Sequence, residues 1–187
     1  PLISSIRDKL HNVCHCIVLV DDVKPLADDI AITGEYEAMI RVADDRYDFP
    51  ELDENTKATT FYTTGTTGLP KMTSHYHKDI LNICEAFPQY SLQPTQNDVF
   101  TGSPPLGFTF GLGGLVLFPM YFGASTFLIE KPSPDILLQA IQDHKITICF
   151  TAPTAWRIIT TKVNEFDISS LRKCVSAGET LPLKVWQ

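Results

Sequence analysis

The sequence has no segment that is long and apolar enough to cross a membrane, and no secretory leader opens the chain. A membrane-spanning helix needs a run of about 18 or more apolar residues, and the apolar stretches here are interrupted before that length. A leader would show a charged start followed by an apolar core. We therefore expect neither a membrane partner nor secretion, and we predict a cytoplasmic location.

Basic residues are also scarce. The chain has 15 Lys and Arg against 22 Asp and Glu, a net charge of -7. Non-specific binding to nucleic acids depends on many Lys and Arg side chains at the phosphates, so we expect no nucleic-acid partner. The acidic excess lies in residues 1–58, which carry 13 acidic and 6 basic side chains, whereas residues 59–187 carry nine of each.

Cysteines are few and odd in number, and three of the five lie inside apolar runs. This pattern is typical of reduced, buried thiols, and it argues against a disulfide framework. The segment His11–Cys16 offers two His and two Cys, but tight zinc sites usually pair two separated ligand clusters, so we favour the start of a strand there. His75 and His77 are also better explained by packing, and we assign no metal ligands.

Repeats, low-complexity tracts and heptads are absent, which argues against solenoid and coiled-coil architectures. From Ala58 onward, short β-rich runs alternate with helical patterns. The predicted strands are Thr59 to Thr63, Val99 to Thr101, Ser125 to Ile129, Ile146 to Thr151 and Lys173 to Ser176. The predicted helices are Lys78 to Phe87, Gly111 to Tyr121, Pro134 to Asp143 and Thr154 to Val163. This alternation predicts an α/β fold with a largely parallel sheet flanked by helices, and a ligand crevice at the carboxyl ends of the strands.

The chain divides into two regions by composition. Residues 1–58 are an acidic segment, in which we expect a helix ending near His11, a strand at Cys16 to Val20, a helix at Tyr36 to Val42 and charged connectors. Residues 59–187 form the α/β core. We expect any functional site to lie in this second region.

One loop carries residue types that suit phosphate. Thr63–Lys71 reads Thr-Thr-Gly-Thr-Thr-Gly-Leu-Pro-Lys and follows a predicted strand. Its glycines let backbone N–H groups turn inward, its hydroxyls donate hydrogen bonds, and Lys71 adds a compact positive charge. The spacing is not that of a P-loop, because Pro70 stands where that motif needs its second Gly. The alternative is a flexible hairpin without a ligand.

The loop resembles the signature of the adenylate-forming superfamily, usually Thr-Ser-Gly-Thr-Thr-Gly-x-Pro-Lys-Gly, and departs from it at Thr64 and Met72. A Gly is usual where Met72 stands, so a backbone conformation is in question there. Two further segments, Pro105–Gly111 and Ser176–Pro182, resemble the family's substrate-pocket and adenine-pocket motifs. The chain is most similar to benzoate and 2-aminobenzoate CoA ligases, with some medium-chain fatty-acid CoA ligase character.

This resemblance implies a set of site residues. Lys71 and Thr66 are the expected catalytic contacts to the ATP phosphates. The expected nucleotide-binding residues are Thr63, Thr64, Gly65, Thr66, Thr67, Gly68, Lys71, Gly178, Glu179 and Thr180. The expected substrate-pocket residues are His77, Phe108, Phe110, Gly111 and Ala177. The structural alternatives are core packing for the two phenylalanines and an ordinary strand-to-helix turn at Gly178 and Glu179.

The implied reaction joins a carboxylate to the α-phosphate of ATP and then passes the acyl group to coenzyme A, with Mg²⁺ on the phosphates. The expected partners are thus a small carboxylic acid, ATP or AMP, and coenzyme A. We favour an aryl acid over a medium-chain fatty acid, because Phe108 replaces a usual His and suits a flat apolar group. The alternatives are a non-catalytic nucleotide-binding module, an amino-acid adenylation domain and a scaffold with a structural loop.

Later motifs of the family have no counterpart in the sequence, among them the lysine of the C-terminal domain. We therefore expect an internal fragment of the large N-terminal domain of a ligase, without the lysine-bearing domain and inactive by itself. The oligomeric state is left open.

Overall fold

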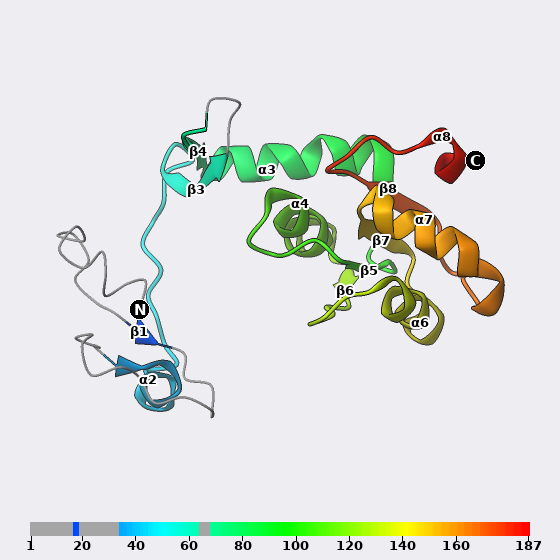
Figure 1. Cartoon of the computed structure of the whole chain (residues 1–187). Coiled ribbons are helices and arrows are strands. Elements are labelled where there is room, and N and C mark those ends of the chain that lie inside the picture. Colours follow the sequence, from blue (N-terminus) through cyan, green and yellow to red (C-terminus); the bar gives the residue numbers. More distant parts are fainter. Residues whose placement is uncertain (1–16, 19–33, 64–67) are drawn as a thin grey trace. The chain divides into compact units, whose positions relative to one another are not determined.

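The computed structural model describes residues 17–18, 34–63 and 68–187 and separates the chain into two compact units, Pro1–Glu51 and Leu52–Gln187. In the first unit, strand β1 (Ile17–Val18) pairs in parallel with β2 (Gly34–Glu35), and helix α2 (Tyr36–Val42) follows directly (Figure 1). The predictions for residues 1–16 and 19–33, including the strand start at His11–Cys16, lie outside the described residues.

The second unit begins with a hairpin. Strand β3 (Lys57–Thr63) pairs antiparallel with β4 (Lys71–Tyr76), and helix α3 (His77–Glu85) leads into the π-helical turn η2 (Pro88–Leu92). Strand β4 is an addition to the predicted strands. The start of α3 is fixed where the Asp79 carboxylate accepts a hydrogen bond from the Tyr76 backbone N–H at 2.8 Å.

Four parallel strands form the main sheet, in the order β6-β5-β7-β8. Their bounds are Val99–Gly102 for β5, Ser125–Thr126 for β6, Ile148–Thr151 for β7 and Lys173–Ser176 for β8. The predicted parallel sheet is thereby confirmed. Strand β6 is shorter than the sequence predicted, because the last ladder contact is the Phe127 N–H on the Phe100 carbonyl at 2.8 Å, and the chain then runs to the surface at Leu128.

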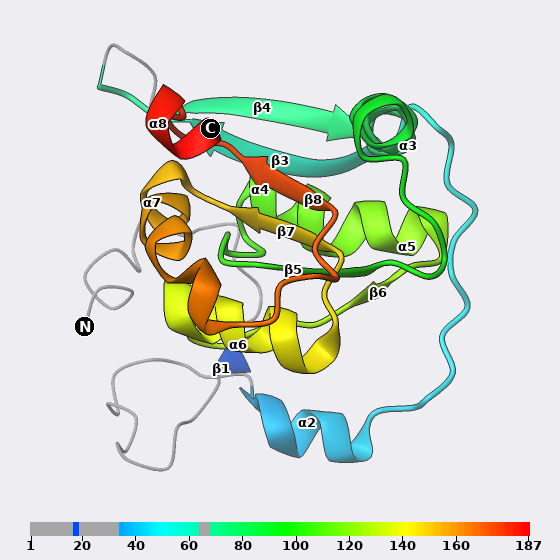
Figure 2. The same cartoon turned by 90° about the vertical axis from the view of Figure 1, so that its right-hand side faces the viewer.

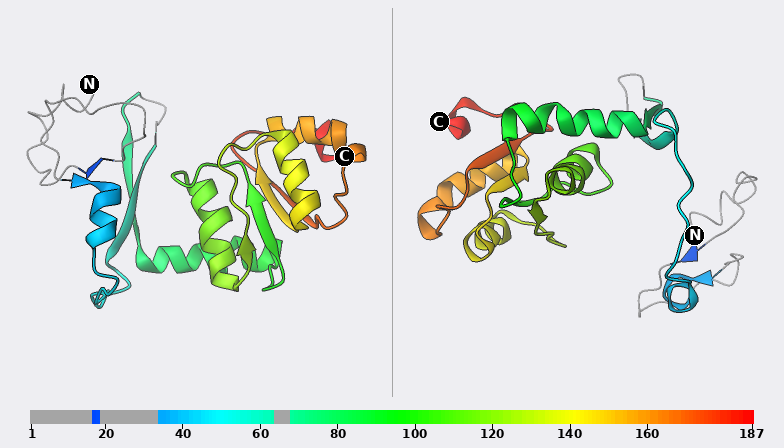
Figure 3. Two further views of the ribbon diagram at one scale, coloured as in Figure 1. Left: turned by 90° about the horizontal axis from the view of Figure 1, so that it is seen from below. Right: turned by 180° about the vertical axis from the view of Figure 1, so that it is seen from behind.

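Helices cover both faces of this sheet (Figure 3). Helix α4 (Thr109–Leu112), the π-helical segment η3 (Gly113–Leu117) and α5 (Phe118–Phe122) lie on one face, and α6 (Pro134–His144) and α7 (Pro153–Lys162) lie on the other. The chain then passes through a 3₁₀ turn (Val163–Glu165) and ends with α8 (Leu183–Trp186). Of the helices within the described ranges, none has the length and hydropathy to cross a lipid bilayer.

Two apolar clusters hold the layers together. The first lies on the α6–α7 face and comprises Leu137, Leu138, Ile141, Ile146, Cys149, Trp156 and Ile159. The second lies on the α4–α5 face and comprises Leu92, Phe100, Leu115, Ile148 and Phe150. Ile148, Cys149 and Phe150 of β7 thus supply both clusters in turn, which explains why these residues are apolar and why the strand is buried along its length.

Local sequence signals position α6 and α7. The Ser133 side chain caps α6 by accepting from the Ile136 backbone N–H, and Pro134 occupies the first helical position. Helix α7 likewise starts with a proline, Pro153, immediately after the buried strand β7. The first turn of α7 is therefore set at the carboxyl end of the central strand.

An ion pair between the buried Asp98 carboxylate and the Arg172 side chain, which is 35% exposed, joins the amino ends of the sheet strands. The Asp98 carboxylate, which is 3% exposed, accepts hydrogen bonds from Arg172 Nε at 2.7 Å and from Arg172 Nη2 at 2.6 Å. Thr95 and Thr147 also donate to it. The Arg172 guanidinium holds the pKa of the Asp98 carboxyl far below its ordinary value, with help from these donors and against the effect of burial.

Candidate functional site

A cavity of about 300 Å³ lies at the carboxyl ends of β5, β7 and β8, and we call it the strand-end cavity. Its lining residues are Ser103, Pro104, Pro105, Phe108, Phe110, Ala152, Ala177 and Gly178. They come from the segments that follow three neighbouring strands, which is the usual place for a ligand crevice in a parallel α/β sheet. Two aromatic rings and mostly small or cyclic neighbours give a cavity suited to a flat, apolar ligand.

The phenylalanines of this cavity occupy different settings. Phe108 precedes the first turn of α4 with an extended backbone, and its side chain is 68% exposed at the rim. Phe110 lies deeper and packs against Phe150 of β7, with ring centroids 5.5 Å apart. Core packing therefore accounts in part for Phe110, whereas it does not account for Phe108.

Two glycines let α4 and η3 approach the sheet. A Cβ atom on Gly111 would collide with the Pro105 backbone, and one on Gly114 would come within 2.5 Å of the Phe150 ring. Gly111 is accordingly buried behind the Pro104–Pro105 turn, and it does not line the strand-end cavity. Its contribution is to let α4, which begins directly after Phe108 and carries Phe110, pack against the backbone of Pro104 and Pro105.

The segment after β8 brings its small residues to the same cavity. Ala177 and Gly178 line it, and Gly178 has φ +93°, a left-handed conformation that favours glycine. Glu179 and Thr180 follow as exposed residues outside the lining. The structure therefore brings Phe108, Phe110, Ala177 and Gly178 together, whereas Glu179 and Thr180 stand at the surface beside them.

The first and last residues of the Thr/Gly loop, Thr63 and Lys71, lie in the two strands of the hairpin. Thr63 and Lys71 are paired across β3 and β4, and both are exposed. Gly68 has φ +85°, again a conformation that favours glycine. Thr64, Gly65, Thr66 and Thr67 lie outside the described residues. In Figure 2 the turn end of this hairpin and the carboxyl ends of β7 and β8 point to the same side of the unit.

Met72 causes no backbone difficulty. It lies in β4, opposite Tyr62 in the antiparallel register, and its side chain is 59% exposed. Extended backbone accepts any side chain, so the usual Gly is not needed at this place in the hairpin.

A smaller cavity of about 150 Å³ lies between the hairpin, α3 and α4. His75 and Phe61 line it together with Leu112 and Gly113. His77, the first residue of α3, is half-buried and lines neither this cavity nor the strand-end cavity. Of the two histidines, the one with a cavity-facing position is thus His75, which the motif did not single out.

Four lining residues of the strand-end cavity were not among the expected site residues, namely Ser103, Pro104, Pro105 and Ala152, and of these only Pro105 belongs to a motif. Ser103 and Ala152 directly follow the buried strands β5 and β7, at the strand ends where a parallel sheet places its ligands. Their position after a predicted strand was the available signal. A larger cavity of about 560 Å³, the Leu128 cavity, shares the Ser103–Pro105 wall and adds Leu128, Ile129 and Glu130.

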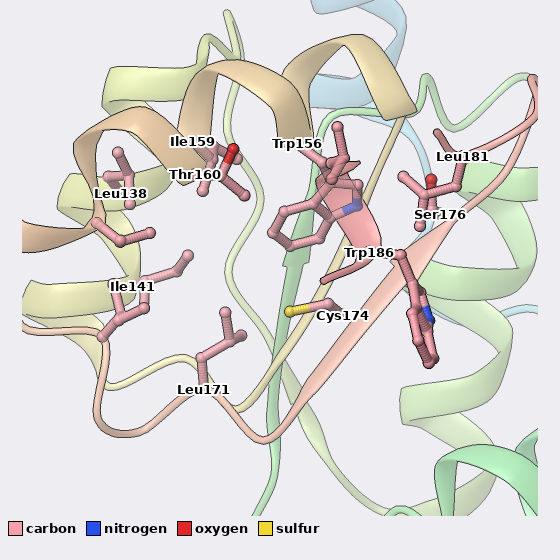
Figure 4. Close-up of a pocket in the computed structure, with 13 residues that line it drawn as sticks. Leu138, Ile141, Trp156, Ile159, Thr160, Leu171, Cys174, Ser176, Leu181 and Trp186 are labelled. Carbon is pink, nitrogen blue, oxygen red and sulfur yellow. The ribbon is translucent and has the colours of Figure 1, made fainter. Parts of the chain in front are cut away.

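An apolar groove of about 310 Å³, the tryptophan groove, lies on the face of the sheet that α6 and α7 cover (Figure 4). Trp156, Cys174 and Trp186 contribute to its lining, and the buried Ser176 hydroxyl beside them has no hydrogen-bond partner among the described residues. The groove contains none of the individually expected site residues, although Ser176 and Leu181 of the Ser176–Pro182 segment line it. In the described ranges, no group of three His, Cys, Asp or Glu side chains is arranged to hold a metal ion.

Known proteins are similar to this chain in both sequence and fold. Residues 2–187 match the AMP-binding enzyme family. The chain is 33% identical over 133 residues to a benzoate–CoA ligase from Thauera aromatica, an alignment that covers 67% of this chain and 25% of that protein. It is 28% identical over 151 residues to the human mitochondrial acyl-coenzyme A synthetase ACSM3, covering 79% of this chain and 26% of that protein.

The fold agrees with a solved relative. The crystal structure of the anthranilate CoA ligase AuaEII in complex with anthranoyl-AMP superposes with a TM-score of 0.83 and 32% identity, covering 100% of this chain and 36% of that one. The chain therefore spans about a quarter to a third of the length of these relatives. The chain belongs to the AMP-binding enzyme family, as its motifs indicated.

Proposed function

We propose that this chain supplies the phosphate loop and the acyl-adenylate pocket of an ATP-dependent carboxylate–CoA ligase. One observation carries the proposal. Segments from two separate sequence motifs, Pro105–Gly111 and Ser176–Pro182, meet at one cavity at the carboxyl ends of the parallel strands. Phe108, which is exposed beside this cavity, offers an aromatic face to a planar ligand.

The chemistry to be performed is the meeting of two anions, a carboxylate and the α-phosphate of ATP. Positive charge and aligned donors must offset their repulsion. Lys71 supplies a positive charge at the first residue of β4, next to the Thr/Gly loop in the sequence. The strand-end cavity would hold the acyl group against Phe110 and exclude water from it.

Magnesium would accompany the nucleotide on its phosphates. The described residues offer no ligand set of their own for this ion, and Glu179 is a single exposed carboxylate. No step proposed for this chain's residues depends on the metal. Coenzyme A would act as the second substrate, as the names of the relatives suggest.

The proposed acid is aromatic. The relatives include a benzoate–CoA ligase and an anthranilate CoA ligase, whereas the acyl-coenzyme A synthetase leaves a medium-chain fatty acid as the alternative. The two phenylalanines and the flat walls formed by Pro104 and Pro105 favour the aromatic acid.

ATP binding tests the role of the hairpin. Lys71→Ala should weaken ATP affinity of the chain at least fivefold, because a cation at the phosphates contributes about 1 kcal/mol or more. Lys57→Ala is the matched control, since Lys57 is an exposed lysine at the opposite end of the same hairpin. Equal affinities for both variants, measured by calorimetry, would remove Lys71 from the proposed site.

The acid class is tested with two adenylate analogues that differ only in the acyl group, benzoyl- and octanoyl-sulfamoyl adenosine. The proposal predicts tighter binding of the benzoyl probe, and Phe110→Ala should reduce that preference. Tighter binding of the octanoyl probe would favour the fatty acid. If the chain bound neither probe, the acyl-adenylate pocket would be refuted.

A further inference from the structure

A hydrogen-bonded pair of hydroxyl groups lies outside the motifs that define the family resemblance: Ser103 lines the strand-end cavity, and Thr151 is buried next to Ser103. Ser103 directly follows β5, and Thr151 ends β7. Their side-chain oxygens are 2.5 Å apart, and the Ser103 backbone N–H donates to the Phe150 carbonyl at 3.0 Å. This backbone contact fixes Ser103 next to the central strand, so the hydroxyl pair is part of the sheet edge rather than of a free loop.

Burial decides the direction of the hydrogen bond between the two hydroxyls. Thr151 is 0% exposed, and within residues 34–63 and 68–187 its hydroxyl makes one hydrogen bond, the one with Ser103. A buried hydroxyl whose proton has no acceptor costs free energy, so the Thr151 proton points to Ser103 Oγ. The Ser103 proton is then left for another acceptor.

Ser103 is only partly buried, and it is the one residue with a hydrogen-bonding side chain among the described residues that line the strand-end cavity. We propose that Ser103 donates a hydrogen bond to an oxygen atom of the bound aromatic acyl group, and that Thr151 is a positioning residue that orients the Ser103 proton. This inference rests on the function proposed above. It makes Ser103 a substrate-binding residue of that site.

The acceptor is an oxygen in one of two places. It is either the carbonyl oxygen of the acyl group, which every substrate shares, or an oxygen substituent on the aromatic ring. A ring amino group is a poor acceptor, because its lone pair is delocalised into the ring. The proposed direction of donation therefore distinguishes hydroxy-substituted from amino-substituted acids.

The test uses the 187-residue chain and three sulfamoyl adenosine probes that carry benzoyl, 2-hydroxybenzoyl or 2-aminobenzoyl groups. Ser103→Ala should weaken binding about three- to tenfold, the usual effect of one neutral hydrogen bond. An equal loss for all three probes identifies the acyl carbonyl as the acceptor. A loss confined to the 2-hydroxybenzoyl probe identifies the ring oxygen.

Two results would overturn the proposal, namely unchanged affinity of Ser103→Ala for every probe, and a loss confined to the 2-aminobenzoyl probe. Leu128→Ala is the control, because Leu128 lines the neighbouring Leu128 cavity and not the strand-end cavity. Its affinity should equal that of the unchanged chain. If instead Leu128→Ala mimicked Ser103→Ala, the ligand would occupy the other cavity.

Substitutions at Thr151 test the positioning role. Thr151→Val removes the donor and should weaken binding about two- to threefold, whereas Thr151→Ser should restore affinity, since it keeps the hydroxyl. Urea denaturation of both variants reports folding separately. Equal affinities for the two variants would refute the positioning role. Absence of all probe binding by the unchanged chain would instead refute the proposed function itself, so the two failures are distinguishable.

Discussion

At the scale of single residues, the structure shows positions and contacts that residue type alone did not predict. Gly111 was expected in the substrate pocket, but its backbone packs behind that cavity against Pro105. Met72 departs from the usual Gly and yet stands in ordinary strand backbone. Both differences have the same origin, because a sequence motif specifies which residues recur and not which of them contact a ligand.

Gly114 should tolerate no side chain. Gly114→Ala brings a Cβ atom within 2.5 Å of the Phe150 ring, and such overpacking typically costs about 1–3 kcal/mol of unfolding free energy. Gly107→Ala is the control, since a Cβ there meets nothing within 4 Å. Urea denaturation of both variants measures the difference. Equal stabilities would show that α4 and η3 can move away from β7 without cost.

The thiols should differ in reactivity. Burial raises the pKa of both thiols, but Cys149 is 0% exposed, whereas Cys174 is exposed in the tryptophan groove. Because the thiolate is the reactive form, iodoacetamide should modify Cys174 well before Cys149 in the folded chain. Mass spectrometry of the labelled peptides measures both rates. Equal rates would mean that β7 is not buried as described.

At the scale of elements, hydrophobic periodicity and helix-start prolines identified most helices and strands of the second unit correctly. The predicted helices at Pro134 and Thr154 are α6 and α7, because an apolar face and a proline at the first turn are local signals. Strand β4 could not be found the same way, since Lys71–Tyr76 is mostly polar and is held as a strand by its partner β3. The shortness of β6 likewise depends on neighbours and not on its own sequence.

The ion pair at the amino ends of the strands was not predictable either, since Asp98 and Arg172 are far apart in the sequence. We expect Asp98→Asn to lower the unfolding free energy by about 2 kcal/mol or more, because Arg172 then loses its buried partner. Asp143→Asn is the control, as Asp143 is an exposed acidic residue on α6. A loss no larger than that of the control, in urea denaturation, would contradict the importance of the pair.

The Asp98–Arg172 ion pair should also make the stability of the chain depend on pH in the acid range. The pKa of Asp98 is lower in the folded than in the unfolded chain, so its contribution to stability is present above about pH 4 and is lost as the pH falls toward the folded pKa. The unfolding free energy of the unchanged chain should therefore fall more steeply below pH 4 than that of Asp98→Asn. Parallel pH profiles would show that Asp98 is not ionised in the fold.

At the scale of the whole molecule, the order of the motifs along the chain said more about the family than the amino-acid composition did. Composition argued only against membrane, secreted and nucleic-acid-binding classes, whereas three motifs in sequence indicated the family that residues 2–187 match. Why Ser103 and Ala152 join Phe108 and Gly178 could not be deduced from the motifs, because the order β6-β5-β7-β8 brings distant segments to one edge. The chain spans about a quarter to a third of its relatives, so the complete reaction remains a proposal.

The most direct test of the account is to locate a bound acyl-adenylate on the 187-residue chain. Titration with benzoyl-sulfamoyl adenosine, followed by amide NMR shifts, should move the signals of Phe110, Ala152, Ala177 and Gly178 in a saturable manner. Shifts confined to Trp156, Cys174 and Trp186 would place the ligand in the tryptophan groove instead. That result would contradict the strand-end cavity as the acyl-adenylate site.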